Sequence, residues 1–293
     1  MKLKIYHPIP KFPPISLSGT QCELSCQHCN RAYLRGMRAA MTPEALIRTC
    51  RELRSQGVIG ALLSGGSTRD GGILNLPEMV EAIRTAKAET GLILNIHPGL
   101  MSEATAESLA DVIDFASLDI PSTEAIREVF GLDATTEDYI ATYHRLRGAG
   151  MHVIPHVTVY DGTEDQLLAP IAGGQNPESI VIIVFSPTRG TPMAAEPAPS
   201  PEMVGSVIGR VKEAFPASEI TLGCMRPRTR ELRVALELAA LDAGVTRMEL
   251  PSRQTLAVAR ERGYEIERFD ACCALPRALE PIARRDADEP TIA

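Results

Sequence analysis

The segment Cys22-Glu-Leu-Ser-Cys26-Gln-His-Cys29 places three of the chain's 7 cysteines in one short stretch. With 7 cysteines among 293 residues, two further cysteines at these offsets from any cysteine are expected by chance at a frequency of roughly 0.4%. The clustering is therefore meaningful. Three thiolates held this close together suit a soft metal site.

The same spacing distinguishes between kinds of metal site. A structural zinc site is closed and tetrahedral, and His28 directly precedes Cys29, which is a poor geometry for a fourth ligand to the same ion. A bacterial ferredoxin would have a tighter cysteine run with further cysteines close by. Three thiolates on a four-iron cluster leave one iron open to a small molecule. The spacing therefore indicates chemistry rather than a structural cross-link.

This segment, with the strand-like residues 14–20 before it, resembles the signature of the radical S-adenosylmethionine (SAM) superfamily. In that family the open iron is chelated by the amino and carboxylate groups of SAM, and an electron from the cluster cleaves SAM to methionine and a 5′-deoxyadenosyl radical. The resemblance implies that Cys22, Cys26 and Cys29 hold a [4Fe–4S] cluster with SAM. It also implies that His28, which stands where the family usually has an aromatic residue, lies near the adenine.

Composition sets the class of protein. Hydrophobic residues make up 44% of the chain and charged residues 23%, as in ordinary globular proteins, and the net charge is −7. An acidic chain is a poor partner for nucleic acid or an anionic membrane. The longest apolar run, residues 180–185, is far shorter than the roughly 20 residues that span a bilayer. Prolines rather than an apolar stretch follow Lys2 and Lys4, so no signal peptide is expected and the protein is predicted to be cytoplasmic.

Short apolar or β-branched runs alternate with helical patterns, which predicts βα units around a parallel sheet. The expected strands are 15–18, 60–64, 92–96, 115–120, 152–159, 180–185, 219–222 and 247–250. The expected helices are 42–56, 76–89, 102–112, 136–146, 201–215, 230–243 and 253–262. The pattern predicts one domain, a complete or nearly complete radical SAM (βα)8 TIM-type barrel over residues 14–275. Residues 1–13 are expected as an N-terminal extension and 276–293 as a flexible tail, and Cys50 is expected to pack in the core.

In such a barrel the catalytic residues lie at the C-terminal ends of the strands. Ser64, Gly65, Gly66 and Ser67 end the second expected strand. Radical SAM proteins carry a Gly-Gly-Glu-like motif there, whose backbone carbonyls bind the amino group of SAM. The resemblance implies the same role for these four residues, although Ser67 stands in place of the usual Glu.

Polar residues interrupt the apolar runs of the next three strands. Asn95 and His97 end the third strand, Asp119 ends the fourth, and His156 lies on the fifth. Because buried polar groups need partners, several of these side chains are expected to face the cavity, and Asn95, Asp119 and His156 are candidates for cofactor binding. Polar side chains satisfied within the core remain the alternative.

A second group of cysteines lies late in the chain. Cys224 closes the seventh expected strand, and Cys272 and Cys273 lie beyond the eighth. In a closed barrel the eighth strand pairs with both the seventh and the first, so the three thiols could meet at the catalytic mouth. Three soft ligands with an incomplete shell suggest an auxiliary iron–sulfur cluster of the four-iron type. Its fourth position is either occupied or supported by Arg226 or Arg228, or left open. Three inert buried thiols are the alternative.

An auxiliary cluster next to a SAM cluster resembles the arrangement in biotin synthase and lipoyl synthase, where a bridging sulfide is inserted into a carbon chain. The closer resemblance, over roughly residues 14–275, is to a subunit of the two-component lipoyl synthases. It is carried by residues 16–22, 64–67 and 223–228. It implies thiolation of a protein-bound octanoyl chain. It also implies three partners, namely a sister radical SAM subunit, an octanoylated carrier protein and a ferredoxin or flavodoxin.

Two other functions fit the same residues. Another radical SAM enzyme of cofactor biosynthesis, with biotin synthase-like or carbon–carbon bond chemistry, would share the first cluster and could use the second for electron transfer alone. A non-enzymatic iron–sulfur electron carrier or metal scaffold would release no deoxyadenosine from SAM.

Overall fold

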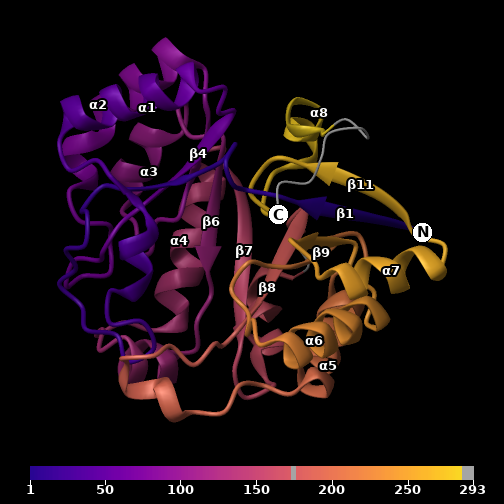
Figure 1. The fold of residues 1–293 in the computed structure, drawn as a ribbon. Coiled ribbons are helices and arrows are strands. Elements are labelled where there is room, and N and C mark those ends of the chain that lie inside the picture. Colours follow the sequence, from indigo (N-terminus) through magenta and orange to yellow (C-terminus); the bar gives the residue numbers. More distant parts are fainter. Residues whose placement is uncertain (173–175, 286–293) are drawn as a thin grey trace.

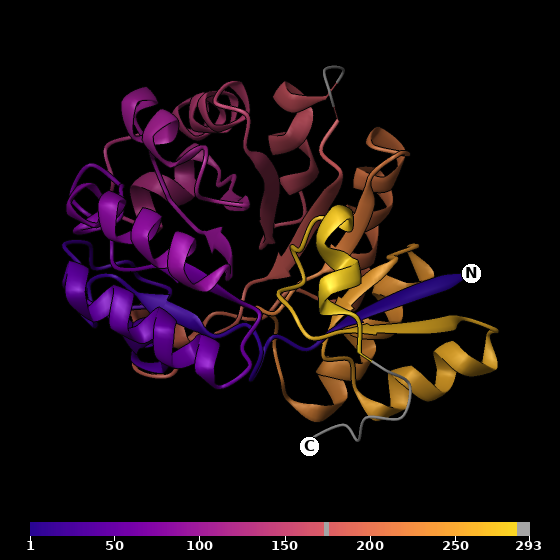
Figure 2. The same cartoon turned by 90° about the horizontal axis from the view of Figure 1, so that it is seen from above.

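The computed structural model describes residues 1–172 and 176–285, and its framework is one 11-stranded parallel sheet (Figure 1). The strands are β1 (Lys2–Tyr6), β2 (Pro14–Ser16), β3 (Arg38–Ala39), β4 (Gly60–Ser64), β5 (Ile93–Ile96), β6 (Phe115–Asp119), β7 (His152–Val159), β8 (Ser179–Val184), β9 (Glu219–Leu222), β10 (Arg247–Glu249) and β11 (Glu265–Phe269). Their order across the sheet is β11-β1-β10-β9-β8-β7-β6-β5-β4-β2-β3. The sheet curls into a half-barrel with helices around its outside (Figure 2).

Helices connect most neighbouring strands, as expected for βα units. They are α1 (Pro43–Ser55), α2 (Leu76–Thr90), α3 (Glu103–Leu109), α4 (Thr136–Gly148), α5 (Pro201–Ala214), α6 (Arg230–Asp242), α7 (Arg253–Glu261) and α8 (Glu280–Ala283), with short 3-10 or π turns at η1 (Ala32–Gly36), η2 (Ala125–Val129), η3 (Glu164–Ile171), η4 (Pro192–Ala195) and η5 (Arg277–Leu279). Helix α1 illustrates why the helices pack against the sheet. Leu46, Cys50 and Leu53 follow the helical repeat and are all buried, so this face of the helix, including Cys50, packs in the core.

The prediction of a single α/β domain built on a parallel sheet is confirmed, and every expected strand is present to within a few residues at its ends. Three strands were not foreseen, and one of them is β3, a two-residue strand that pairs with β2 at the edge of the sheet. Residues 1–13 contain β1, which lies between β10 and β11, and β11 follows α7. Both are short strands with charged residues at alternate positions, so their local pattern is weak. Within the described residues no helix is long and apolar enough to cross a membrane.

The predicted closure of the barrel through its eighth strand is wrong. That strand, β10, pairs with β9 as expected, but its other neighbour is β1 and not the first expected strand, β2. The edges of the sheet are therefore β3 and β11, which do not pair with each other. The reason is that β1 supplies the hydrogen-bonding edge that β10 needs, and the carbonyl of Tyr6 also accepts the N–H of Leu250 just beyond β10.

The first part of the predicted flexible tail is structured. Glu280 of α8 accepts hydrogen bonds from the Tyr6 hydroxyl at 2.7 Å and from Lys4 Nζ at 2.9 Å. The N–H of Asp270 donates to the carbonyl of Ala283 at 2.7 Å. These contacts attach residues 276–285 to the sheet. Residues 286–293, the rest of the predicted tail, lie outside the described residues.

Candidate functional site

The early cysteines lie on the loop that follows β2, at the C-terminal edge of the sheet. The carbonyl of Cys26 accepts the N–H groups of Cys29 at 3.3 Å and Asn30 at 2.9 Å, and Asn30 and Arg31 adopt left-handed backbone angles (φ 41° and 64°). This tight turn brings Cys26, His28 and Cys29 together, with one ligand atom from each within 4.8 Å of the others. Residues adjacent to the cysteine motif thus shape the loop that presents it.

The thiols of Cys26 and Cys29 are hydrogen-bonded to each other. This bond lowers the pKa of Cys29 to about 7 and, together with burial, raises the pKa of Cys26. Because the thiolate is the form that binds metal, one ligand of the loop is poised to lose its proton near neutral pH. Cys22 lies at the start of the loop, where its sulfur accepts the N–H of Ser67 at 3.2 Å.

Residues 64–67, predicted to bind the SAM amino group, pack directly on the cysteine loop. The N–H of Gly66 donates to Ser18 Oγ at 2.7 Å, and the carbonyl of Ser67 accepts the N–H of Glu23 at 2.9 Å. Gly66 has no room for a side chain, because a Cβ there would lie 2.0 Å from the carbonyl oxygen of Gln21 and 2.6 Å from the Cβ of Cys22. Ser64 donates to the carbonyl of His97 at 3.4 Å. Each backbone carbonyl has two lone pairs, so those at this strand end can accept further hydrogen bonds.

His28 occupies an aromatic pocket. Its ring centroid lies 5.4 Å from that of Phe130 and 6.1 Å from that of Tyr33. Burial lowers the pKa of His28, so the ring is a neutral aromatic group at neutral pH. Its Nδ1 atom is buried without a hydrogen-bond partner among the described residues, which suits a site completed by a ligand.

The polar residues at the next strand ends are partly satisfied by one another. Asn95 is fully buried and exchanges hydrogen bonds with the Ser117 hydroxyl at 3.0 and 3.2 Å. His97 Nε2 lies 3.1 Å from Asp119 Oδ2, and His156 Nδ1 donates to the carbonyl of Ile154 at 2.9 Å. Some polar atoms of these residues are therefore satisfied by neighbours within the protein, as the alternative interpretation expected. The side chains of His97 and Asp119 nevertheless remain 32% and 39% exposed.

Asp119 lies at the centre of this group. Burial alone would raise its pKa, but the imidazoles of His97, His156 and His28 hold it below its ordinary value. Its Oδ1 atom has no hydrogen-bond partner among the described residues. Asp119 thus connects His28 of the cysteine loop to His97 and His156 on the neighbouring strands.

The structure brings the three late cysteines together. The thiol of Cys273 is near enough to both Cys224 and Cys272 for each of them to raise its pKa. Cys273 in turn lowers the pKa of Cys272 to about 7. Asn95 Nδ2 lies 3.7 Å from the sulfur of Cys272, and His97 is close enough to Cys224 and Cys272 for their charges to act on its pKa. The late cysteines therefore border the group that Asp119 connects to the early loop.

The sequence of residues 17–169, more than half of the chain, matches the family model described as the radical SAM superfamily. The chain belongs to this superfamily. It is therefore an enzyme of the kind that binds a [4Fe–4S] cluster and SAM. No curated protein matches the sequence.

Solved structures show the same fold at low identity. HydG, a maturase of the [FeFe]-hydrogenase, is 15% identical with a TM-score of 0.63, and the match covers 96% of this chain and 66% of HydG. Methylornithine synthase (PylB) is 20% identical with a TM-score of 0.56, covering 85% of this chain and 72% of PylB. SuiB of Streptococcus suis, bound to SAM, is 16% identical with a TM-score of 0.58, covering 83% and 59%. These similarities establish the fold of this radical SAM enzyme.

The residues of the early loop fit the cluster that the family requires. Cys22, Cys26 and Cys29 lie in the matched region, and the lowered pKa of Cys29 favours a thiolate. The Nδ1 atom of His28 is buried without a partner among the described residues. The backbone of Gly66 lies directly against Gln21 and Cys22. Both provide polar atoms beside the cysteine loop. When bound, the cluster and SAM supply a carbon radical that can remove hydrogen from an unactivated carbon.

The close approach at Gly66 leads to a prediction for this radical SAM enzyme. Gly66→Ala is expected to lower the free energy of unfolding by about 1–3 kcal/mol and to reduce the iron bound at the early loop, because the new methyl group meets a backbone carbonyl that cannot easily move. Urea unfolding of the metal-free protein and iron per chain after reconstitution measure the two effects. Gly65→Ala is the matched control, since its Cβ would meet only Ile73 Cγ2 at 3.1 Å and Ser18 Oγ at 3.2 Å, with Ser18 N farther away at 3.4 Å. Equal losses in both variants would contradict this account.

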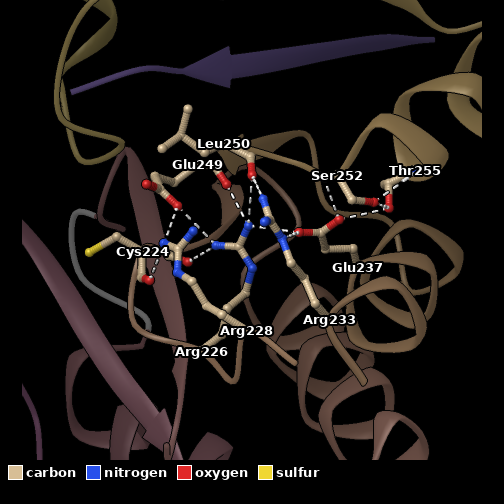
Figure 3. A network of polar contacts seen from close by, with 10 residues as sticks. Cys224, Arg226, Arg228, Arg233, Glu237, Glu249, Leu250, Ser252 and Thr255 are labelled. Atoms are coloured by element: carbon tan, nitrogen blue, oxygen red, sulfur yellow. Dashed lines mark hydrogen bonds and ion pairs between the residues drawn. The ribbon is translucent and has the colours of Figure 1, made fainter. Parts of the chain in front are cut away.

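A buried ionic network lies beneath the Cys224 loop (Figure 3). Arg226 donates to Glu237 at 2.9 Å and to Glu249 at 3.1 Å, and it also bonds the carbonyl of Gly223 at 2.6 Å. Its side chain is fully buried, so its guanidinium is held by these partners and Arg226 supports the loop rather than acting as the fourth cluster ligand considered above. Arg228 bonds Glu249 at 3.0 Å and the carbonyl of Cys224 at 2.9 Å. Figure 3 shows the sulfur of Cys224 on the side away from Glu237.

Replacement of Arg226 and replacement of Arg228 are expected to lower the stability of the protein to different extents. Arg226→Met is expected to lower the free energy of unfolding by about 3–5 kcal/mol. It removes the fully buried cation that bonds both Glu237 and Glu249, and leaves Glu237 with only the partly exposed Arg233 as its cation. Arg228→Met is expected to lower it by only about 0–1 kcal/mol, because the Arg228 side chain is 43% exposed. Urea unfolding of the two metal-free variants checks this. A similar decrease in the free energy of unfolding of both variants would show that burial does not determine how much each arginine contributes.

Several residues of the site have no signal in the local sequence. Phe130, directly after η2, and Tyr33 of η1 pack on His28, and the Tyr33 hydroxyl lies 3.0 Å from the Thr188 hydroxyl. Tyr139 of α4 is near enough to Asp119 and Cys26 for both to act on its pKa. Only the folded chain brings these side chains to the strand ends.

Proposed function

We propose that this radical SAM enzyme inserts sulfur into an unactivated carbon chain, with an auxiliary iron–sulfur cluster on Cys224, Cys272 and Cys273 as the sulfur source. The observation that supports this is the position of the late cysteines. They contact one another and border the same polar group that reaches the early cysteine loop. Thiols that only fill the core would be expected among apolar side chains, and not beside the partly exposed pair of His97 and Asp119.

The substrate we propose is a protein-bound octanoyl chain, so that the enzyme acts as a subunit of a lipoyl synthase. Each insertion replaces one C–H bond by one C–S bond, the hydrogen leaving in 5′-deoxyadenosine and the surplus electron passing to cluster iron. The sequence resemblance at residues 16–22, 64–67 and 223–228 supports this assignment. A sister radical SAM subunit, an octanoylated carrier protein and a ferredoxin or flavodoxin are the proposed partners.

The chain's own residues have distinct roles in this proposal. The early loop positions SAM beside His28 and the backbone of residues 64–67. The polar group around Asp119 lies between the two cysteine groups, where the substrate carbon must reach. Arg226 and Glu249 hold the loop that carries Cys224.

Labelled sulfide tests the proposal directly. The protein is reconstituted anaerobically with iron and ³⁴S-sulfide, freed of excess sulfide, and given SAM, reductant and an octanoyl-lysine peptide for a single turnover. Mass spectrometry of the peptide is expected to show ³⁴S bound to the chain. Unlabelled product, or deoxyadenosine without sulfur product, rejects sulfur insertion and favours another radical SAM reaction. A lack of deoxyadenosine would reject enzymatic SAM cleavage altogether.

A further inference from the structure

The auxiliary cluster proposed above has three cysteine ligands, and a four-iron cluster has a fourth iron. The polar side chains that contact the three thiols or act on their charges are those of Asn95, His97, Arg226, Arg247 and Glu249, and Arg228 bonds the carbonyl of Cys224. Arginine keeps its protons in proteins, so the three arginines offer no lone pair. The carboxylate of Glu249 is bound by both Arg226 and Arg228. The amide of Asn95 is bound to Ser117. His97 is the remaining donor.

We propose that His97 is the fourth protein ligand of the auxiliary cluster, through its Nδ1 atom. This inference rests on the proposed auxiliary cluster. The Nε2 atom of His97 faces Asp119 Oδ2 at 3.1 Å, while Nδ1 has no hydrogen-bond partner among the described residues. Metal-binding histidines commonly donate their second ring N–H to a carboxylate, which fixes the tautomer and increases the basicity of the ligating nitrogen. Asp119 is in the position that such a partner requires.

The backbone places His97 on the same side as Asn95. The N–H of His97 donates to the carbonyl of Leu63 at 2.9 Å, so the strand geometry of β5 continues through this residue. Residues two apart on a strand point to the same face. Asn95 already reaches the sulfur of Cys272 at 3.7 Å, and His97 lies one step further toward the C-terminal edge of the sheet. The charges of Cys224 and Cys272 both act on His97.

His156 is the neighbouring imidazole and serves as a contrast. Its ring centroid lies 5.7 Å from that of His97. Its Nδ1 is bound to the carbonyl of Ile154, and the charges that act on it are those of His97 and Asp119 rather than those of the late cysteines. The two histidines therefore form a matched pair, in which one adjoins the thiols and the other does not.

Pulsed electron paramagnetic resonance (EPR) tests the inference on the auxiliary site alone. The background variant carries Cys22→Ala, Cys26→Ala and Cys29→Ala, so that only the late cysteines can hold a cluster. The protein is reconstituted with iron and sulfide, reduced, and measured without SAM, once at natural abundance and once with ¹⁵N-histidine. A nitrogen coupling that changes with the isotope is expected. It should be lost in His97→Ala and retained in His156→Ala.

The outcomes separate this inference from the proposed function. If the background variant binds no iron–sulfur cluster, the auxiliary cluster itself is rejected. If the cluster is present without histidine nitrogen coupling, or the coupling survives His97→Ala, the ligand assignment is overturned while the sulfur-donor proposal stands. The isotope comparison uses the chain with His97 intact, so it decides the question even where His97→Ala does not fold.

Discussion

Replacement of Cys22, Cys26 and Cys29 together by alanine is expected to reduce 5′-deoxyadenosine formation from SAM to the level of a protein-free control. We expect these cysteines to be the cluster ligands of the early loop, and a cluster with no thiolates cannot stay bound there. Deoxyadenosine is measured by liquid chromatography after anaerobic incubation with SAM and dithionite. Iron should also fall, by about four per chain, because one four-iron cluster is lost.

Cys50→Ala is the matched control for this loss. Cys50 is 1% exposed in the core of α1, and burial raises the pKa of its thiol to about 11, so it is a packed thiol rather than a ligand. Its variant should keep its iron and its SAM cleavage. Deoxyadenosine formation by the early triple variant at the rate of the Cys50→Ala protein would refute the assignment of the early loop.

Replacement of Cys224, Cys272 and Cys273 together by alanine is expected to separate the two activities. Iron should fall from about eight to about four per chain, since the early four-iron cluster remains. SAM cleavage should persist, while ³⁴S incorporation into the octanoyl peptide should disappear. The physical reason is that the groups acting on the late thiols are one another, Asn95, His97, Glu249 and nearby arginines, whereas Cys22 bonds Ser67 and Cys26 pairs with Cys29.

Two outcomes would count against the role of the late cysteines. Unchanged iron in the triple variant would show that they are packed thiols. Loss of iron together with loss of all deoxyadenosine would show that the late group supports the early loop structurally. Circular dichroism of the metal-free protein distinguishes this second outcome from misfolding.

The fold could be predicted in outline because its signal is local. Each buried strand of the half-barrel is an apolar run, and each helix has its own amphipathic repeat, as α1 shows with Leu46, Cys50 and Leu53. Pairing between strands has no such local signal. The neighbour of β10 depended on β1, which is more than two hundred residues away in the chain, and residues 2–6 are too short to indicate their partner.

The site was predictable to different extents for the same reason. The early cysteines and the glycines at residues 65–66 belong to single loops, so their spacing indicated their use. The polar residues Asn95, Asp119 and His156 could be recognised at the strand ends, but no local pattern indicates that His97 and Asp119 face each other. Arg226 was considered as a cluster ligand because its structural partners, Glu237 of α6 and Glu249 of β10, are distant in sequence and could not be recognised.

The position of β1 connects the first residues of the chain to the late cysteines. Tyr6 stacks on Phe269 with 5.2 Å between ring centroids, and the N–H of His7 donates to the carbonyl of Phe269, four residues before Cys273. Removal of residues 1–7 is therefore expected to disturb Cys272 and Cys273 as a mutation beside them would. Under the proposed function, the shortened protein would keep SAM cleavage and lose sulfur insertion.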